Sequence, residues 1–199
     1  MRFGRGTMLR MMFKPTYDED GLYTNHICDF MDDPEFRVAY DLCFYSGSSQ
    51  GFHWRWRVHV LLWAASVSRG LEGDFVECGT YLAGAASAIV SYVDFNRLNK
   101  KFYLIDTYNG LPEEYRNIHN YKEKNYYDRI FNSFIGYPGV HLIKGVIPQV
   151  LHEHDFGKVS FLHIDLGPPM PEIESLRFFW GKLVKGAMVV LNYYSYPTN

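Results

Sequence analysis

From residue 73 onward, the chain alternates short apolar runs with segments of helical character, and this alternation constrains the fold most. The apolar runs cover residues 73–79, 100–108, 139–145, 159–166 and 186–194. Helical segments are predicted between them, at 82–93, 121–134, 146–154 and 171–183. Strands that alternate with helices form right-handed crossover units, and near-continuous apolar strands suit a sheet covered on both faces. The pattern therefore predicts an α/β fold with a parallel sheet.

Residues 1–52 lack this alternation and are predicted to form an irregular, partly helical N-terminal extension. Turn residues interrupt it, for example at 18–21, and a short helix is expected around 36–44. Apolar residues then recur at helical spacing over 53–71, which predicts a helix ahead of the first strand. We therefore divide the chain into an extension and a main domain at 53–199.

Composition and charge exclude several classes of protein. The 199 residues are 47% hydrophobic and 21% charged, which excludes a disordered chain, a collagen-like repeat and a disulfide scaffold. The net charge of −2 gives no support to a nucleic-acid or anionic-membrane partner. The longest apolar stretches, such as 60–67, are far shorter than the roughly 20 residues that a membrane helix needs. We expect neither nucleic acid nor a membrane as a partner.

The chain has three cysteines, Cys28, Cys43 and Cys78, at spacings that match no zinc-binding pattern. An odd and sparse count favours free thiols in a reducing compartment. The start of the chain contains no apolar run long enough for a secretory signal. These observations predict a soluble, cytoplasmic protein.

In an open parallel sheet, ligands bind beyond the carboxyl ends of the strands, so the residues there carry the functional information. The first predicted strand ends in Glu77 and Gly79, followed by Gly84, in an E-x-G-x-x-x-x-G pattern. Gly79 allows a tight turn and a close approach of the backbone to a ligand. The pattern differs from the G-x-G-x-x-G of dinucleotide-binding proteins and could equally be a simple strand-to-helix turn.

The second predicted strand ends at Asp106, one strand–helix–strand unit after Gly79. A carboxylate at this place can accept two hydrogen bonds from a ribose diol. A solvated aspartate at a strand end is the alternative. The combination of Asp106 with the glycine turn favours a nucleoside site.

The fourth and fifth predicted strands end in Asp165 and Asn192, which we expect on adjacent strand ends facing one substrate pocket. A buried carboxylate can bind a metal ion, act as a general base or be a capped structural acid. His163 should point to the same face as Asp165, because side chains alternate along a strand. We interpret His163 as a packed core histidine rather than as a catalyst.

Several segments together resemble the S-adenosylmethionine-dependent sugar O-methyltransferases of the macrocin and mycinamicin type. The matching segments are DFVECGTYLAG, LIDTYNGLPEE, LIKGVIPQVL and LHIDLGPPMPEIESLRFFWGKLVKGAMVVLNYY. HWRWRVHVLLWAA is similar to the helix that precedes the glycine turn in a bacterial branch of that family. The resemblance covers about residues 53–194. It implies a Rossmann-like, doubly wound sheet with strand order 3-2-1-4-5 and helices on both faces.

The resemblance also implies roles for individual residues. The methionine moiety of the cofactor would be surrounded by Glu77, Gly79, Thr80, Tyr81 and Gly84. Asp106 would hold the ribose, with Thr107 beside it. Gly145 and Val146 would flank the adenine. The expected activity is transfer of a methyl group from S-adenosylmethionine to a small-molecule hydroxyl, such as that of a sugar or polyol.

A divalent metal is the further ligand that the resemblance implies, with Asp165 as the catalytic acid that helps to bind it. The family carries two acids and an aromatic residue after the fifth strand, where this chain has Asn192, Tyr193 and Tyr194. An asparagine offers one neutral oxygen, and magnesium favours carboxylates. We therefore expect a weakened Mg²⁺ site at Asp165 and Asn192, and cofactor binding that is more secure than metal-dependent turnover.

Two other functions stay open. The chain could be a degenerate or truncated methyltransferase homologue that binds only the cofactor or a partner chain. It could also be a dinucleotide-dependent oxidoreductase, although the missing G-x-G-x-x-G argues against this. The methyltransferases that the chain resembles continue past the fifth strand into an antiparallel hairpin, which we expect to be missing here. Either the chain is truncated, or the N-terminal segment or a second subunit in a homo-oligomer covers that strand.

Overall fold

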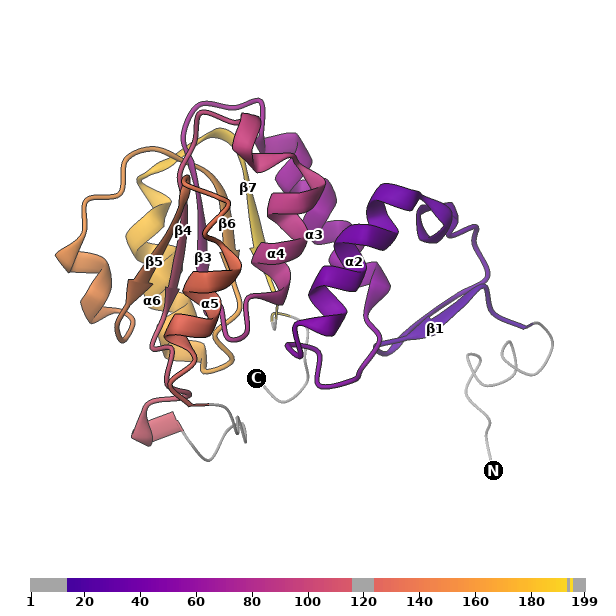
Figure 1. Cartoon of the computed structure of the whole chain (residues 1–199), viewed down its shortest axis with the longest axis horizontal. Helices are drawn as coiled ribbons and strands as arrows, with labels where there is room; N and C mark the ends of the chain where they lie inside the picture. The colour runs from indigo at the N-terminus through magenta and orange to yellow at the C-terminus, as the bar shows by residue number, and fades with distance from the viewer. Residues whose placement is uncertain (1–13, 116–123, 193, 195–199) are drawn as a thin grey trace.

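A single parallel sheet organises the protein, and its strand order agrees with the sequence-based expectation. The computed structural model describes residues 14–115, 124–192 and 194. The sheet has the order β5-β4-β3-β6-β7, with every neighbouring pair parallel. Its strands are β3 (Asp74–Cys78), β4 (Phe102–Asp106), β5 (Val140–Lys144), β6 (Val159–Ile164) and β7 (Leu183–Leu191). In order of appearance along the chain this is 3-2-1-4-5, the predicted doubly wound order (Figure 1).

Helices cover both faces of the sheet, and alternating strand residues supply one core to each face. The first core lies under α2 (Pro34–Tyr45), α3 (Arg55–Ser68), α4 (Gly84–Tyr92) and α5 (Tyr127–Ser133). The second lies under α6 (Pro169–Trp180) and the 3-10 helix η4 (Gln149–Glu153). Phe75 of β3 packs in the first core and Val76 in the second. This division follows from the period of two along a strand.

Local sequence explains where several of these elements begin. Asp33 caps α2, because its side chain accepts a hydrogen bond from the backbone N–H of Glu35, and Pro34 opens the helix. The small residues of α4 allow that helix to pack closely against α2 and β3. The connections also contain short 3-10 helices, η2 (Phe95–Arg97) and η3 (Glu113–Tyr115). The helix predicted over 121–134 is shorter in the structure, and 116–123 lie outside the described residues.

The N-terminal extension is more ordered than its sequence suggests. It begins with an antiparallel hairpin of β1 (Tyr17–Glu19) and β2 (Leu22–Thr24), followed by the 3-10 helix η1 (Asp29–Asp32). Asp20 and Gly21, which form the hairpin turn, both have positive φ angles, as a tight two-residue turn requires. Helix α2 of the extension shares the first core with α4. The extension and the main domain are therefore packed together rather than joined by a linker.

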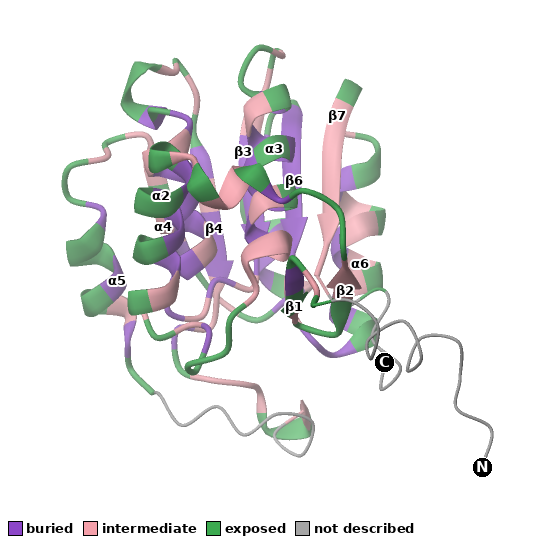
Figure 2. Cartoon of the chain, turned by 90° about the vertical axis from the view of Figure 1, so that its right-hand side faces the viewer, coloured by how far each residue is buried: buried purple, intermediate pink, exposed green. Residues whose placement is uncertain are grey.

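β7 forms one edge of the sheet, as the resemblance implied for the fifth strand. Its residues are partly buried or exposed, whereas β3 and β6 are almost wholly buried (Figure 2). Met188 and Val190 pack on the first core, and Val189 and Leu191 pack on the second. Both faces of β7 are thus covered, and only its outer edge lacks a neighbouring strand among the described residues.

Cys28, Cys43 and Cys78 are all free, as the cysteine count predicted, and all three are buried. Within the described part of the chain, the helices are all too short or too polar to cross a bilayer.

Among the described glycines, Gly79 leaves the least room for a side chain. Its φ is +87°, and a Cβ added there would lie 2.1 Å from the carbonyl oxygen of Asp165. Changing Gly79→Ala should therefore lower the free energy of unfolding by about 2–4 kcal/mol, measured by urea titration. Gly136→Ala is the matched control, because an added Cβ meets nothing within 4 Å there. Equal stability of the two variants would contradict this account.

Candidate functional site

Polar side chains gather at the carboxyl ends of four strands, on the face that α3 and α4 cover. Each follows an apolar residue of the first core on the same strand by an even number of positions. These apolar residues include Phe75, Leu104, Phe161 and Val190. The period of two therefore turns all of them toward that face. The polar residues are Glu77 on β3, Asp106 on β4, His163 on β6, and Asp165 and Asn192 just beyond β6 and β7.

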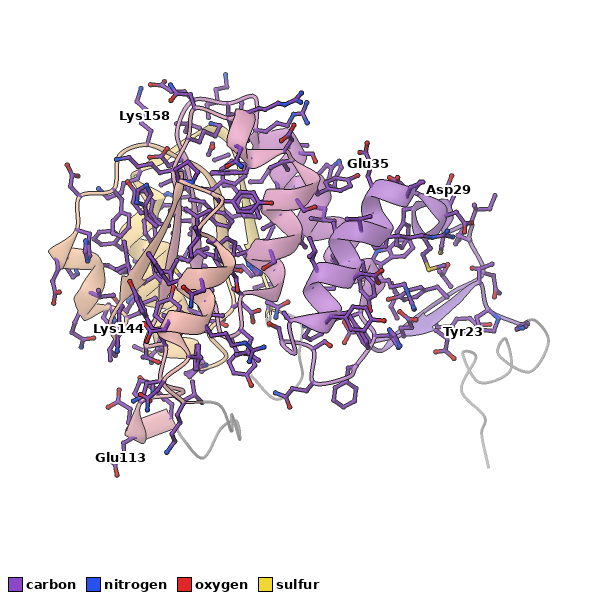
Figure 3. The ribbon with its side chains drawn as sticks, in the orientation of Figure 1. Tyr23, Asp29, Glu35, Glu113, Lys144 and Lys158 are labelled. Atoms are coloured by element: carbon purple, nitrogen blue, oxygen red, sulfur yellow. The ribbon has the colours of Figure 1, made fainter. Side chains whose placement is uncertain are left out.

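A first cavity opens beyond the carboxyl ends of β3, β4 and β5, and it extends past the end of β6, beside which the strand order reverses. Lys144, at the end of β5, and Glu113, in η3, mark this end of the sheet, and Lys158 marks the opposite end (Figure 3). Six of the predicted cofactor residues line this cavity, namely Gly79, Tyr81, Asp106, Thr107, Gly145 and Val146. Loop residues 110–112 and Tyr115 close one side. The structure thus brings together residues from three separate strand ends.

Asp106 organises the glycine turn through its carboxylate. Oδ2 accepts hydrogen bonds from the backbone N–H groups of Thr80 and Tyr81, both at 2.9 Å. Oδ1 accepts from the backbone N–H of Tyr108 at 2.7 Å and from the hydroxyl of Tyr126 at 2.9 Å. Burial, together with the nearby charge of Asp106, raises the pKa of Tyr126, so this hydroxyl stays protonated and remains a donor. A ligand at Asp106 would compete with the Tyr126 hydroxyl rather than with the fixed backbone donors.

Gly84 lines neither cavity at this end of the sheet. Its backbone N–H donates to the hydroxyl of Ser48 at 3.0 Å, and an added Cβ would meet Ser46, Ser48 and the carbonyl of Cys43 within 3 Å. Gly84 therefore permits the start of α4 to pack against the end of α2. Its contact with the methionine moiety stays a prediction.

A second cavity adjoins the first and is bounded by the loop before α3, by α3 itself and by the ends of β3, β6 and β7. Gly79, Tyr81 and Asp165 line both cavities. The other lining residues are Cys43, Ser48, Ser49, Gln50, Phe52, Trp54, Arg57, Val58, Leu61, Glu77, Thr80, Ala85, His163, Val190 and Asn192. The two cavities therefore meet at the glycine turn.

Glu77 and His163 form a buried pair on neighbouring strands at the floor of the second cavity. They are directly opposite in the β3–β6 register, and Nδ1 of His163 lies 2.9 Å from Oε1 of Glu77. Burial raises the pKa of Glu77. Burial alone would lower the pKa of His163, but the hydrogen bond and charge of Glu77 outweigh it and raise that pKa. His163 is thus buried as expected, although in a polar pair rather than in apolar packing.

Four buried polar atoms of residues that line the second cavity have no hydrogen-bond partner within the described chain. They are Oε2 of Glu77, the hydroxyl oxygens of Ser49 and Thr80, and Nε1 of Trp54. Unpartnered buried polar atoms are costly, so they indicate a ligand or water that satisfies them. The free carboxylate oxygen of Glu77 suits an ammonium group, as in an amino-acid moiety. Together with the first cavity, these atoms fit a ligand that joins a nucleoside to an amino acid.

Asp165 and Asn192 meet as expected, but a cationic side chain lies beside them. Nδ2 of Asn192 donates to Oδ1 of Asp165 at 2.6 Å. Nη1 of Arg57 donates to Oδ1 of Asn192 at 3.2 Å, and Arg57 also forms an ion pair with Asp20. The described residues contain no group of three His, Cys, Asp or Glu side chains that could hold a metal ion. These residues do not fit a divalent metal, and Tyr193 lies outside the described residues.

Sequence reasoning did not identify Arg57 and Tyr126 as residues of this site. Arg57 follows Arg55 on the same helix, and both arginines pair with acids of the β1–β2 hairpin. No local signal distinguishes the arginine that reaches the cavity from the one that does not. Several tyrosines lie near Tyr126 in the sequence, and only the hydrogen bond between its hydroxyl and Asp106 distinguishes it from them.

Solved structures with a similar fold are methyltransferases. The chain resembles the O-methyltransferase NovP with a TM-score of 0.56 and 17% identity. This match covers 71% of the chain and 66% of NovP, so the chain spans just under two thirds of the length of NovP. It resembles CalS11, a calicheamicin methyltransferase, with a TM-score of 0.54 and 16% identity, over 100% of this chain and 86% of CalS11.

Apo CalS11, described as a TDP-rhamnose 3'-O-methyltransferase of calicheamicin biosynthesis, matches with a TM-score of 0.50 and 16% identity. This match covers 86% of the chain and 81% of CalS11. No protein-family model matches the sequence, and no curated protein is significantly similar to it. At these identities the likeness is one of fold. The chain has the Rossmann-like fold that these methyltransferases share, as its motifs suggested.

Proposed function

We propose that this protein is an S-adenosylmethionine-dependent O-methyltransferase that acts on a small-molecule hydroxyl, of a sugar or similar polyol. The observation that carries the proposal is the first cavity, lined by six residues that the sequence marks for the cofactor. Those residues come from the ends of β3, β4 and β5, where an open parallel sheet binds its ligand. The fold shared with NovP and CalS11 adds support.

The proposed cofactor roles follow from the position of each residue. Gly145 and Val146 would flank the adenine, and Asp106 would accept the ribose hydroxyls after the Tyr126 hydroxyl moves away. Glu77 would hold the ammonium group with its unpartnered Oε2, and Thr80 lies beside it in the second cavity. When bound, S-adenosylmethionine supplies an electrophilic methyl group on a sulfonium sulfur.

The part of the second cavity away from Glu77 and Thr80 is the proposed acceptor site. Asp165 lines both cavities, so its carboxylate lies where an acceptor hydroxyl would approach the cofactor. We propose that Asp165 orients this hydroxyl and receives its proton as the oxygen becomes methylated. The walls formed by Phe52, Trp54 and Leu61 would exclude water and fix the acceptor in line with the methyl group.

The full chain should bind S-adenosylhomocysteine, measured by isothermal titration calorimetry. Val146→Trp should weaken this binding at least about tenfold, because a large ring would fill the adenine part of the first cavity. Val60→Trp is the matched control. Val146 is 40% exposed and Val60 41%, so both variants should fold, but Val60 lines neither cavity. Absence of binding at millimolar ligand, or equal binding by both variants, would contradict the proposal.

A second candidate function is cofactor binding without catalysis. It is favoured by Asn192, which stands where the similar family has a carboxylate, and by the occupied oxygens of Asp165 and Asn192. Such a protein would bind the nucleoside and act through a partner chain. It would retain the first cavity and the glycine turn.

Methyl transfer to a panel of nucleotide sugars, free sugars and polyols separates the two functions. With labelled cofactor, we expect a methyl ether of at least one acceptor by mass spectrometry. Asp165→Asn should lower the rate at least about 100-fold, while S-adenosylhomocysteine binding is kept. If cofactor binds and no acceptor across these classes is methylated, the non-catalytic function is the correct one.

We also propose that the protein is a cytoplasmic homo-oligomer in which a second copy covers the outer edge of β7. The buried free cysteines support a reducing compartment, and unpaired strand edges are usually covered in folded proteins. Sedimentation velocity should therefore show a species larger than the monomer, with slow hydrogen exchange of the β7 amides. A monomer whose outer β7 amides exchange rapidly would rule this assembly out.

A further inference from the structure

Arg57 is fixed in the second cavity by the N-terminal hairpin. Its guanidinium donates from Nε to Oδ2 of Asp20 at 2.9 Å and from Nη2 to Oδ1 and Oδ2 at 2.8 and 2.6 Å. Its Cζ lies 4.9 Å from the ring centre of Trp54. A bidentate pair of this kind fixes both the position and the orientation of the guanidinium plane. Among the described residues that line this cavity, Arg57 is the single lysine or arginine.

The remaining end of the guanidinium fixes the amide of Asn192. Nη1 of Arg57 donates to Oδ1 of Asn192, and Nδ2 of Asn192 donates to Oδ1 of Asp165. Turning the amide over would place its N–H groups against a cation and its oxygen against a carboxylate. Both neighbours therefore determine the orientation of Asn192. A continuous polar chain results, from Asp20 through Arg57 and Asn192 to Asp165.

We infer that Arg57, held by Asp20, takes the place of a divalent metal ion as the positive charge of the second cavity. The inference concerns the acceptor part of the function proposed above and rests on it. The guanidinium of Arg57 donates a hydrogen bond to the amide oxygen of Asn192. A metal ion at Asp165 and Asn192 would need that same oxygen as a ligand.

Electrostatics and ligand chemistry both support this inference. A hard divalent cation needs several oxygen ligands, carboxylates above all, and magnesium demands octahedral geometry. Here one oxygen of Asp165 accepts from an amide and the Asn192 oxygen accepts from a cation. A second cation placed there would also be repelled by the guanidinium. Among the described residues, Asp20 on the hairpin pairs with Arg57, and the Arg57 charge acts on the His163 imidazole together with the charges of Glu77 and Asp165 at the strand ends.

A fixed guanidinium can perform the electrostatic part of a metal's role. Its positive charge, preorganised beside Asp165, would stabilise negative charge that develops on an acceptor oxygen. Unlike a metal ion, it cannot chelate two oxygens of a diol within one coordination sphere. The cavity should therefore not require a second hydroxyl adjacent to the one that is methylated. The N-terminal hairpin, which carries Asp20, becomes a support of the active site.

Manganese binding tests the inference directly. Mn²⁺ is titrated into the full chain, with S-adenosylhomocysteine present, and free Mn²⁺ is measured by electron paramagnetic resonance. The wild type should show no saturable site. R57Q/N192D removes the cation and restores a carboxylate, so it should bind Mn²⁺ at least about tenfold more tightly than wild type.

The matched control is R55Q/N192D, which removes the neighbouring arginine, paired with Glu19 outside the second cavity. It keeps Arg57 and should bind Mn²⁺ no better than wild type. Circular dichroism melting shows whether each variant is folded. If R57Q/N192D does not fold, a comparison of Mn²⁺ binding by the wild type and by Asp165→Asn still tests the inference.

Saturable Mn²⁺ binding to wild type that is lost in Asp165→Asn would overturn the inference. So would equal Mn²⁺ binding by the two double variants, or none by a folded R57Q/N192D. Calorimetry with S-adenosylhomocysteine on the same wild-type sample reports the proposed function separately. Failure of S-adenosylhomocysteine to bind would contradict the proposed function. The Mn²⁺ result could still be interpreted independently.

Discussion

The hydrogen bonds that the Asp106 carboxylate accepts are the interaction on which the candidate site depends. They join the glycine turn after β3, the loop after β4 and the tyrosine that precedes α5. The turn itself contains Gly79, Tyr81 and Ala83 at positive φ, a conformation that ordinary residues adopt at a cost. The Asp106 carboxylate accepts hydrogen bonds from two successive backbone N–H groups of this turn, and these bonds offset that cost. The first cavity has its shape because these three segments meet at one side chain.

Polar groups at the end of the first core set the chemistry of the second cavity. Glu77 and His163 follow Phe75 and Phe161 on the same strand faces, so the core passes directly into the cavity floor. A buried carboxylate is destabilising unless it is paired, and the imidazole supplies that pair. One oxygen of Glu77 is still unsatisfied within the described chain. The floor is therefore arranged for a ligand at some expense of stability.

The fold and part of the site could be predicted because they depend on local patterns. Apolar alternation identified every strand of the sheet, and turn residues such as Gly79 marked where the first strand ends. The hairpin at Asp20 and Gly21 could not be predicted as paired strands, because strands of three residues carry almost no periodic signal. Its pairing is stabilised by contacts with α3, including the bond from the Trp56 N–H to the Tyr17 hydroxyl.

The sequence by itself determined the parallel sheet, the turn at Gly79 and the carboxylates at the strand ends, because strand period and backbone sterics act within a few residues. Tertiary structure alone decided which charges meet there. Arg55 and Arg57 are equivalent in sequence, yet only Arg57 reaches Asn192, since helix α3 packs against the first core and the hairpin is bonded to α3. The charge of the second cavity is therefore set by contacts between segments far apart in the chain.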